Sequence, residues 1–100
     1  MLGQVLGVAV GAQIAATPAE GYAACCGAIC GLNTLDHLPR LTHPALVMVG
    51  EQDHATPVAL SRQIAQAWPG AQLVVLPDAA HLSNLEQPDA FNRELLRFLG

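Results

Sequence analysis

The stretch Ala45-Leu46-Val47-Met48-Val49-Gly50 decides the fold class of this chain. Its five consecutive apolar residues are too few for a helix, and the glycine that closes them is a breaker. A similar run, Gln72-Leu73-Val74-Val75-Leu76, is closed by Pro77. Short continuous apolar runs are typical of strands that are covered on both faces, as in parallel sheets. The sequence therefore predicts two buried parallel strands.

A helical pattern follows each of the two predicted strands. Thr56-Pro57 predicts a helix start, with Thr56 as the cap and proline at the first helical position. Apolar residues then recur at helical spacing until Pro69-Gly70, namely Leu60, Ile64, Ala67 and Trp68. Residues 88–99 have the same periodicity, with a stripe of Phe91, Leu95, Phe98 and Leu99. A strand, a crossover helix and a second parallel strand form a βαβ unit. We therefore predict the fold class α/β, with residues 45–100 as a βαβα arrangement.

The first 44 residues have a different composition, rich in alanine, glycine and cysteine up to about residue 32. Residues 1–16 carry no charge and predict an apolar segment, either helical or a tight turn between a strand and a helix. Residues 17–44 predict a buried helix from Pro18 to Gly31, with Thr17 as its cap, followed by a connector. The three cysteines, Cys25, Cys26 and Cys30, are expected to be small buried apolar residues of a reducing, cytoplasmic compartment.

Composition excludes several classes of function. Apolar residues make up 52% of the chain and charged residues 12%, which excludes intrinsic disorder. The formal net charge of −4, with four arginines and no lysine, provides no basic stripe for nucleic acid. Four scattered histidines and one cysteine cluster do not make the spacing of a metal site. A membrane helix is an alternative for residues 1–16 because Gly3, Gly7 and Gly11 are regularly spaced, but Pro18 interrupts the apolar run too early.

Two loops that follow the predicted strands carry the candidate catalytic residues. The loop from Gly50 to Thr56 contains Asp53, and the loop from Pro77 to Ser83 contains His81. Ligands of open α/β sheets bind outside the carboxyl ends of the strands, where both loops would lie. A carboxylate beside an imidazole is the orienting half of a nucleophilic triad. His54 is expected to be an exposed neighbour of the acid, and no role is assigned to the histidines of the connector.

Several blocks of this sequence resemble the α/β-hydrolase family. Val49 to Asp53, Ala79 to Leu82 and Glu86 to Pro88 are similar to its acid and histidine blocks, in the family's order of Ser, Asp and His along the chain. Glu20 to Cys26, with the segments around the acid and the histidine, is more specifically similar to the 3-oxoadipate enol-lactonases. Those enzymes open a lactone in the β-ketoadipate pathway of bacterial aromatic catabolism.

The resemblance implies a fold, a site and a substrate class. Residues 45–100 would be the C-terminal βαβα part of the hydrolase core, and residues 17–44 the return from the lid to the core. Asp53 would be the triad acid and His81 the general base. The substrate of the intact enzyme would be a small anionic lactone or ester, and no metal or organic cofactor would be needed.

The nucleophile of the family is missing from the sequence pattern. It sits in a G-x-S-x-G turn, and Ser61 and Ser83, the two serines of this chain, are not flanked by glycines. Gly7-Val8-Ala9-Val10-Gly11 has the glycines with alanine at the serine position, either as a degenerate turn or as part of an Ala/Gly-rich helix. We therefore expect the chain by itself to be inactive.

Besides the membrane-associated alternative that residues 1–16 offer, two interpretations of the whole chain remain open at this point. In the first, the chain is the acid–base part of a hydrolase that pairs with a missing N-terminal half. In the second, it is a truncated, non-catalytic hydrolase that serves as a binding or oligomerising module. Self-association is expected in either case because part of the sheet edge is left bare.

Overall fold

The computed structural model describes residues 2–100, which fall into two compact units with the boundary after Thr34. The N-terminal unit contains α1 (Leu2–Ala16) and α2 (Ala19–Cys30). Gly7 to Gly11 lies inside α1, so this stretch is a continuous helix and not a turn between a strand and a helix. Within the described residues, no helix is sufficiently long and apolar to cross a membrane.

Two expectations for the N-terminal unit are wrong. No residue of α2 is buried, and all three cysteines are exposed, because a unit of two short helices offers too little surface to cover either helix. The expected cap of α2 also fails to form: the Thr17 hydroxyl donates a hydrogen bond back to the carbonyl oxygen of Gln13 at 2.9 Å, and no side chain caps the helix. Threonine often bonds in this way to a carbonyl four residues earlier.

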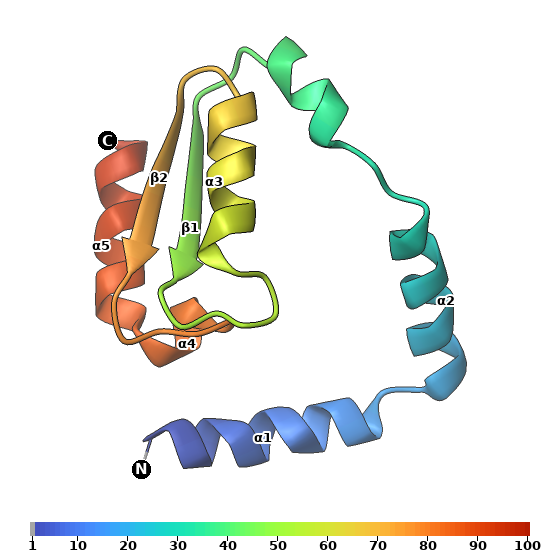
Figure 1. Ribbon diagram of the computed structural model, residues 1–100. Helices are drawn as coiled ribbons and strands as arrows, with labels where there is room; N and C mark the ends of the chain where they lie inside the picture. Colours follow the sequence, from blue (N-terminus) through green and yellow to red (C-terminus); the bar gives the residue numbers. More distant parts are fainter. Residues whose placement is uncertain (1) are drawn as a thin grey trace. The chain divides into compact units, whose positions relative to one another are not determined.

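The C-terminal unit confirms the predicted βαβα arrangement (Figure 1). It begins with a short 3-10 helix, η1 (Leu35–Arg40). Then follow β1 (Ala45–Gly50), α3 (Val58–Ala67), β2 (Ala71–Leu76), α4 (Ser83–Glu86) and α5 (Pro88–Leu99). The two strands pair in parallel, from Ala45 opposite Ala71 to Gly50 opposite Leu76, so both end at the same edge of the sheet.

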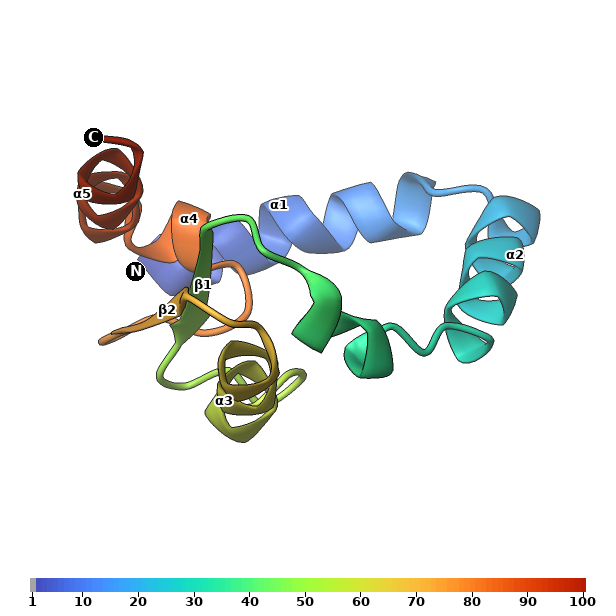
Figure 2. The ribbon, with the colours of Figure 1, turned by 90° about the horizontal axis from the view of Figure 1, so that it is seen from above.

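The helices cover the sheet from both sides, but only in part. Figure 2 shows α3 on one face of the sheet and α5 on the other. Of β1, Val49 and Gly50 are buried, whereas its first four residues are half-buried, so the expectation of fully buried strands is met only at the carboxyl end. Within the C-terminal unit, the two strands and the two long helices α3 and α5 are too few to close a complete core.

The best-buried residues gather where the strands end. Val49, Leu76 and Ala79 are 4%, 2% and 1% exposed, and Asp53 is buried beside them. The ends of β1 and β2, together with Asp53 and Ala79 from the loops that follow them, are therefore the best-buried part of the unit. This packing holds the side chains that follow the strands in fixed positions.

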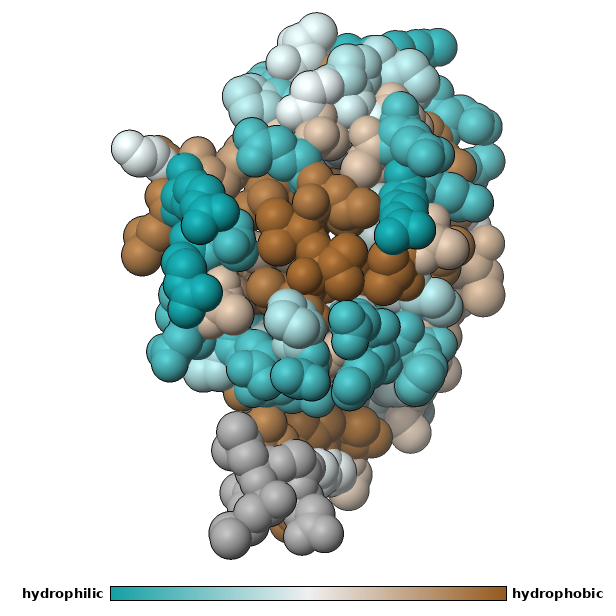
Figure 3. All heavy atoms as spheres, turned by 60° about the vertical axis from the view of Figure 1, so that its left-hand side comes forward, coloured by the Kyte–Doolittle hydropathy of each residue, from teal (hydrophilic) through white to brown (hydrophobic). Residues whose placement is uncertain are grey.

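We expect the 100-residue chain to self-associate. Figure 3 views the unit from the β2 side and shows apolar atoms in the middle of that face, between hydrophilic rims. Exposed leucines on the flanking helices, Leu60, Leu96 and Leu99, are 46%, 68% and 69% exposed. Bare sheet edges and apolar patches of this kind promote association. Sedimentation velocity at increasing concentration should show oligomers, and a monodisperse monomer with a cooperative thermal transition would contradict the prediction.

Candidate active site

The loops that follow β1 and β2 are hydrogen-bonded to each other. The backbone N–H of Glu51 donates to the carbonyl oxygen of Leu76 at 2.9 Å, and that of Gln52 donates to Ala79 at 2.8 Å. Gly50 lies so close to the second loop that a Cβ atom on it would overlap the carbonyl oxygens of Ala79 and Ala80. The absence of a side chain at Gly50 therefore lets the two loops meet.

Asp53 is fixed by donors from its own loop. Its Oδ1 accepts the backbone N–H groups of Ala55 at 3.0 Å and of Thr56 at 2.9 Å. Its Oδ2 accepts the hydroxyl of Thr56 at 2.9 Å. Aspartate commonly forms such turns by bonding backbone groups two or three residues on. The residue is only 6% exposed, so the carboxylate is buried and held in one orientation.

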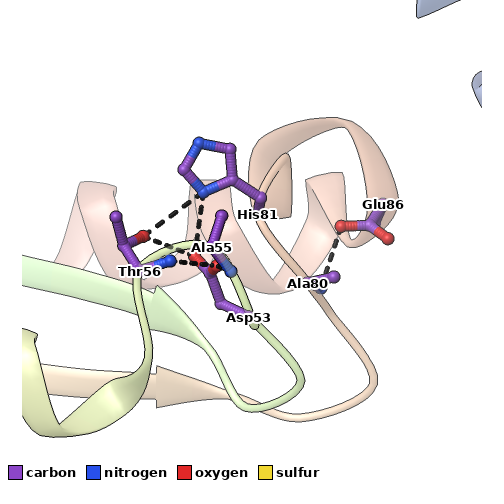
Figure 4. Close-up of polar contacts among 6 residues, drawn as sticks. All are labelled: Asp53, Ala55, Thr56, Ala80, His81 and Glu86. Atoms are coloured by element: carbon purple, nitrogen blue, oxygen red, sulfur yellow. Dashed lines mark hydrogen bonds and ion pairs between the residues drawn. The ribbon is translucent and has the colours of Figure 1, made fainter.

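His81 completes the pair from the second loop. Its Nδ1 lies 3.0 Å from Asp53 Oδ2, and 3.3 Å from Thr56 Oγ1. In Figure 4 the other ring nitrogen, Nε2, points away from the carboxylate. The His81 side chain is 58% exposed, whereas that of Asp53 is 4% exposed. One ring nitrogen is thus bound by protein groups, and the other faces outward, where a reacting group has access.

The environment of Asp53 keeps its carboxyl group ionised. The backbone hydrogen bond from Thr56 is the largest cause that lowers the pKa of Asp53; burial opposes it, and the hydrogen bonds from His81 and the Thr56 hydroxyl lower the pKa further. The net result is a pKa lowered from 3.8 to about 2. A carboxylate only accepts hydrogen bonds, so the Nδ1 of His81 must be the donor in the contact between the two side chains.

The lowered pKa of Asp53 predicts how acid affects stability. Because the pKa is lower in the folded chain than in the unfolded chain, the unfolded state binds more protons between pH 4 and pH 2. The stabilisation from the ionised carboxylate is therefore fully present above about pH 4 and is lost as the pH falls through about 2. Urea unfolding across this range should show a steeper loss of stability for the wild-type chain than for Asp53→Asn; equal slopes would contradict the prediction.

The backbone next to His81 is held by the junction between α4 and α5. Glu86 Oε2 accepts the backbone N–H of Ala80 at 2.8 Å, one residue before the histidine (Figure 4). The Gln87 side chain donates to the carbonyl oxygen of Asp78 at 3.0 Å. Asp78 itself has a φ of 54°, in the left-handed region that aspartate tolerates better than most residues. The second loop is therefore fixed at three consecutive residues before His81.

The structure brings together Asp53 and His81, the two residues that the sequence predicts for the site. The other histidine and serine candidates do not join this pair. His54 is exposed, as expected. Ser61 lies within α3, and Ser83 is buried at the start of α4, so neither occupies a turn between a strand and a helix. Among the described residues, no group of three or more His, Cys, Asp or Glu side chains is placed to hold a metal ion.

Sequence reasoning missed the roles of Thr56 and Glu86. Thr56 was expected to cap the following helix, but no side chain caps α3, and the hydroxyl binds Asp53 instead. The spacing of Asp53 and Thr56 in the sequence could have indicated this bond, because a hydroxyl three residues after an aspartate can donate a hydrogen bond to its carboxylate. The sequence places Glu86 only in the block from Glu86 to Pro88 and does not predict its hydrogen bond to the backbone of Ala80.

A parallel βαβα unit with a carboxylate and an imidazole on its two strand-end loops is the arrangement found in α/β hydrolases. The chain belongs to this family: a family model described as the alpha/beta hydrolase family matches residues 3–94. The chain corresponds to the C-terminal part of that fold. The resemblance noted in the sequence is thereby confirmed.

Comparison with individual proteins shows which α/β hydrolases the chain resembles. The chain is 42% identical to 3-oxoadipate enol-lactonase 2 of Acinetobacter baylyi over 80% of its own length and 30% of the relative. The crystal structure of the enol-lactonase from Burkholderia xenovorans matches with a TM-score of 0.76 and 44% identity, over 80% of this chain and 30% of that one. The structure of a thermophilic esterase from Thermogutta terrifontis matches with a TM-score of 0.64 and 38% identity, over 66% of this chain and 24% of the esterase. The chain thus spans about 30% of the length of the enol-lactonases it matches.

Proposed function

We propose that this chain supplies the acid and the base of an active site that hydrolyses carboxylic esters or lactones. The observation that carries the proposal is the 3.0 Å contact between Asp53 Oδ2 and His81 Nδ1, on the two loops that follow the parallel strands. The buried carboxylate fixes the imidazole, and the exposed side of the ring is free to exchange a proton. The acid and the histidine of a Ser-His-Asp triad have the same two roles, because the acid orients the imidazole and the imidazole transfers the proton.

In the proposed reaction, His81 acts twice. Nε2 removes the proton from a serine hydroxyl as that oxygen attacks the carbonyl carbon, and the proton then passes to the leaving oxygen. The same nitrogen activates the water that hydrolyses the acyl-enzyme and regenerates the serine. Asp53 stays ionised throughout and stabilises the imidazolium that forms in each half of the reaction.

The serine of this reaction would come from polypeptide outside the 100 residues. Ser61 and Ser83, the serines of the chain, lie in α3 and at the start of α4, and Ala9 has no hydroxyl. The family's serine sits in a strained turn that directs its hydroxyl outward. We therefore propose that the chain alone does not hydrolyse esters at a measurable rate.

The proposed substrate is a small anionic lactone or ester, in the catabolism of aromatic compounds in the cytoplasm. Support comes from the enol-lactonases of Acinetobacter baylyi and Burkholderia xenovorans, at 42% and 44% identity. The thermophilic esterase, at 38% identity, supports the broader class of carboxylic ester hydrolysis. No metal or organic cofactor takes part in the proposed mechanism.

A chimera tests the proposal. The segment of the Burkholderia xenovorans enol-lactonase that matches this chain is replaced by the corresponding residues of this chain, and hydrolysis of an enol-lactone and of a 4-nitrophenyl ester is measured. The unaltered 100-residue chain is the parallel control and should show no turnover. A folded chimera without activity towards either substrate would contradict the proposed function.

A second candidate is a non-catalytic module that binds a partner or forms oligomers. The apolar surface beside β2 in Figure 3 favours it. The chimera separates the two candidates, because a module that has lost its catalytic role has no reason to keep a competent Asp53–His81 pair. A well-folded but inactive chimera, together with oligomers of the chain in sedimentation, would support the module.

A further inference from the structure

The Thr56 side chain lies within hydrogen-bonding distance of both members of the pair. Its hydroxyl oxygen lies 2.9 Å from Asp53 Oδ2 and 3.3 Å from His81 Nδ1. These three atoms form a closed triangle with the 3.0 Å contact between the aspartate and the histidine, visible in Figure 4. A hydroxyl has one hydrogen to donate and can also accept, so its orientation depends on the other two groups.

The hydrogen atoms of the triangle can be assigned by elimination. The ionised Asp53 cannot donate, so the Thr56 hydroxyl must give its single hydrogen to Oδ2. The oxygen of Thr56 then presents only lone pairs towards His81. Nδ1 of His81 therefore faces two acceptors, and the ring satisfies both by carrying its proton on Nδ1.

We infer that Thr56 is a positioning residue that holds His81 in the tautomer with the proton on Nδ1, so that Nε2 remains free to act as a base. This inference rests on the proposed function for its meaning in catalysis, but the tautomer can be measured without any reaction. Thr56 acts through Asp53 and His81 and touches no reacting atom.

The competing tautomer shows why the hydroxyl matters. With the proton on Nε2, the lone pair of Nδ1 would face the carboxylate, and a donor for it could come only from Thr56. The hydroxyl would then have to leave Oδ2, which exchanges a charge-assisted hydrogen bond for a neutral one of about half its strength. The wild-type chain must therefore break two favourable contacts to change tautomer. A chain without the hydroxyl must break only the contact between Asp53 and His81.

The carboxylate is also oriented by the same hydroxyl. The two backbone donors hold Oδ1, whereas Oδ2 is held from its own loop only by Thr56. The position of Oδ2 opposite Nδ1 therefore depends on this bond. The hydroxyl also contributes to the low pKa of Asp53, which gives a second measurable consequence.

The test uses the 100-residue chain labelled with ¹³C and ¹⁵N, with the signals of His81 identified by their loss in His81→Gln. Thr56→Val should lower the ratio of the Nδ1–H to the Nε2–H tautomer roughly two- to tenfold, the range expected for one hydrogen bond. It should also raise the pKa of Asp53, measured from the carboxyl ¹³C shift. Thr56→Ser, which keeps the hydroxyl, should restore both values. Thr42→Val, at an exposed threonine of the same unit, is the matched control and should change neither.

Two further measurements keep the test decisive. If Thr56→Val does not fold, Thr56→Ala removes the hydroxyl with a smaller side chain and retains the backbone N–H that binds Oδ1. In the active chimera, Thr56→Val should lower kcat and leave KM unchanged, and Thr56→Ser should recover kcat. Unchanged tautomer ratio and Asp53 pKa in both hydroxyl-lacking variants would overturn the inference, even in an active chimera. An inactive chimera with the expected tautomer change would instead overturn the proposed function alone.

Discussion

His81→Ala in the chimera is expected to lower kcat on the order of 10⁶-fold, which is the cost of removing the histidine from a serine hydrolase triad. Without the imidazole, no group accepts the proton of the attacking hydroxyl or returns it to the leaving oxygen. KM should change little, because the ring exchanges protons and is not the main contact for substrate. Steady-state kinetics with the lactone and the 4-nitrophenyl ester measure both parameters.

The matched control is His54→Ala. His54 follows Asp53 directly in the same loop but is exposed, and we expect the activity of this variant to remain close to that of the parent. The kcat of Asp53→Asn should lie between those of His54→Ala and His81→Ala. We expect a loss on the order of 10⁴-fold, because an amide leaves the imidazole in the wrong tautomer. A chimera whose activity survives His81→Ala would exclude His81 as the base, and equal losses in the two histidine variants would point to misfolding.

Gly50→Ala is expected to destabilise the C-terminal unit by about 3 kcal/mol or more, above the usual range for one added methyl group. The added Cβ would meet the backbone carbonyls of Ala79 and Ala80, and backbone cannot rotate aside as a flexible side chain does. Relief would require the second loop to move, together with the His81 that it carries. Urea unfolding of the 100-residue chain measures the loss.

Gly27→Ala provides the control for this substitution. Gly27 lies within α2, and a Cβ atom on it would meet nothing within 4 Å. The same change there should be neutral or slightly stabilising, since alanine favours a helix over glycine by about 1 kcal/mol. A Gly50→Ala variant as stable as the wild-type chain, with His81 still bound to Asp53, would show that the close approach of the two loops is not required.

Local patterns predicted most of the C-terminal unit. The run from Ala45 to Gly50 became β1, and residues 88–99 became α5 with the predicted bounds. These predictions succeeded because strand and helix formation depend on nearby residues and on breakers such as Pro77. Burial was predicted less well: α2 is exposed and the strands are half-covered, because burial depends on which other elements are present to pack against them.

The sequence by itself determined that one carboxylate and one imidazole follow two strands that succeed each other along the chain, because strand formation and side-chain chemistry both depend on local residues. The tertiary structure decided that these strands are neighbours in one sheet. Only the tertiary structure decided that Asp53 and His81 meet at 3.0 Å. It also decided that the hydroxyl of Thr56 binds the carboxylate and does not cap a helix. The physical reason is that a hydrogen bond needs its donor and acceptor within about 3 Å, and loops fixed by contacts between distant residues set that distance.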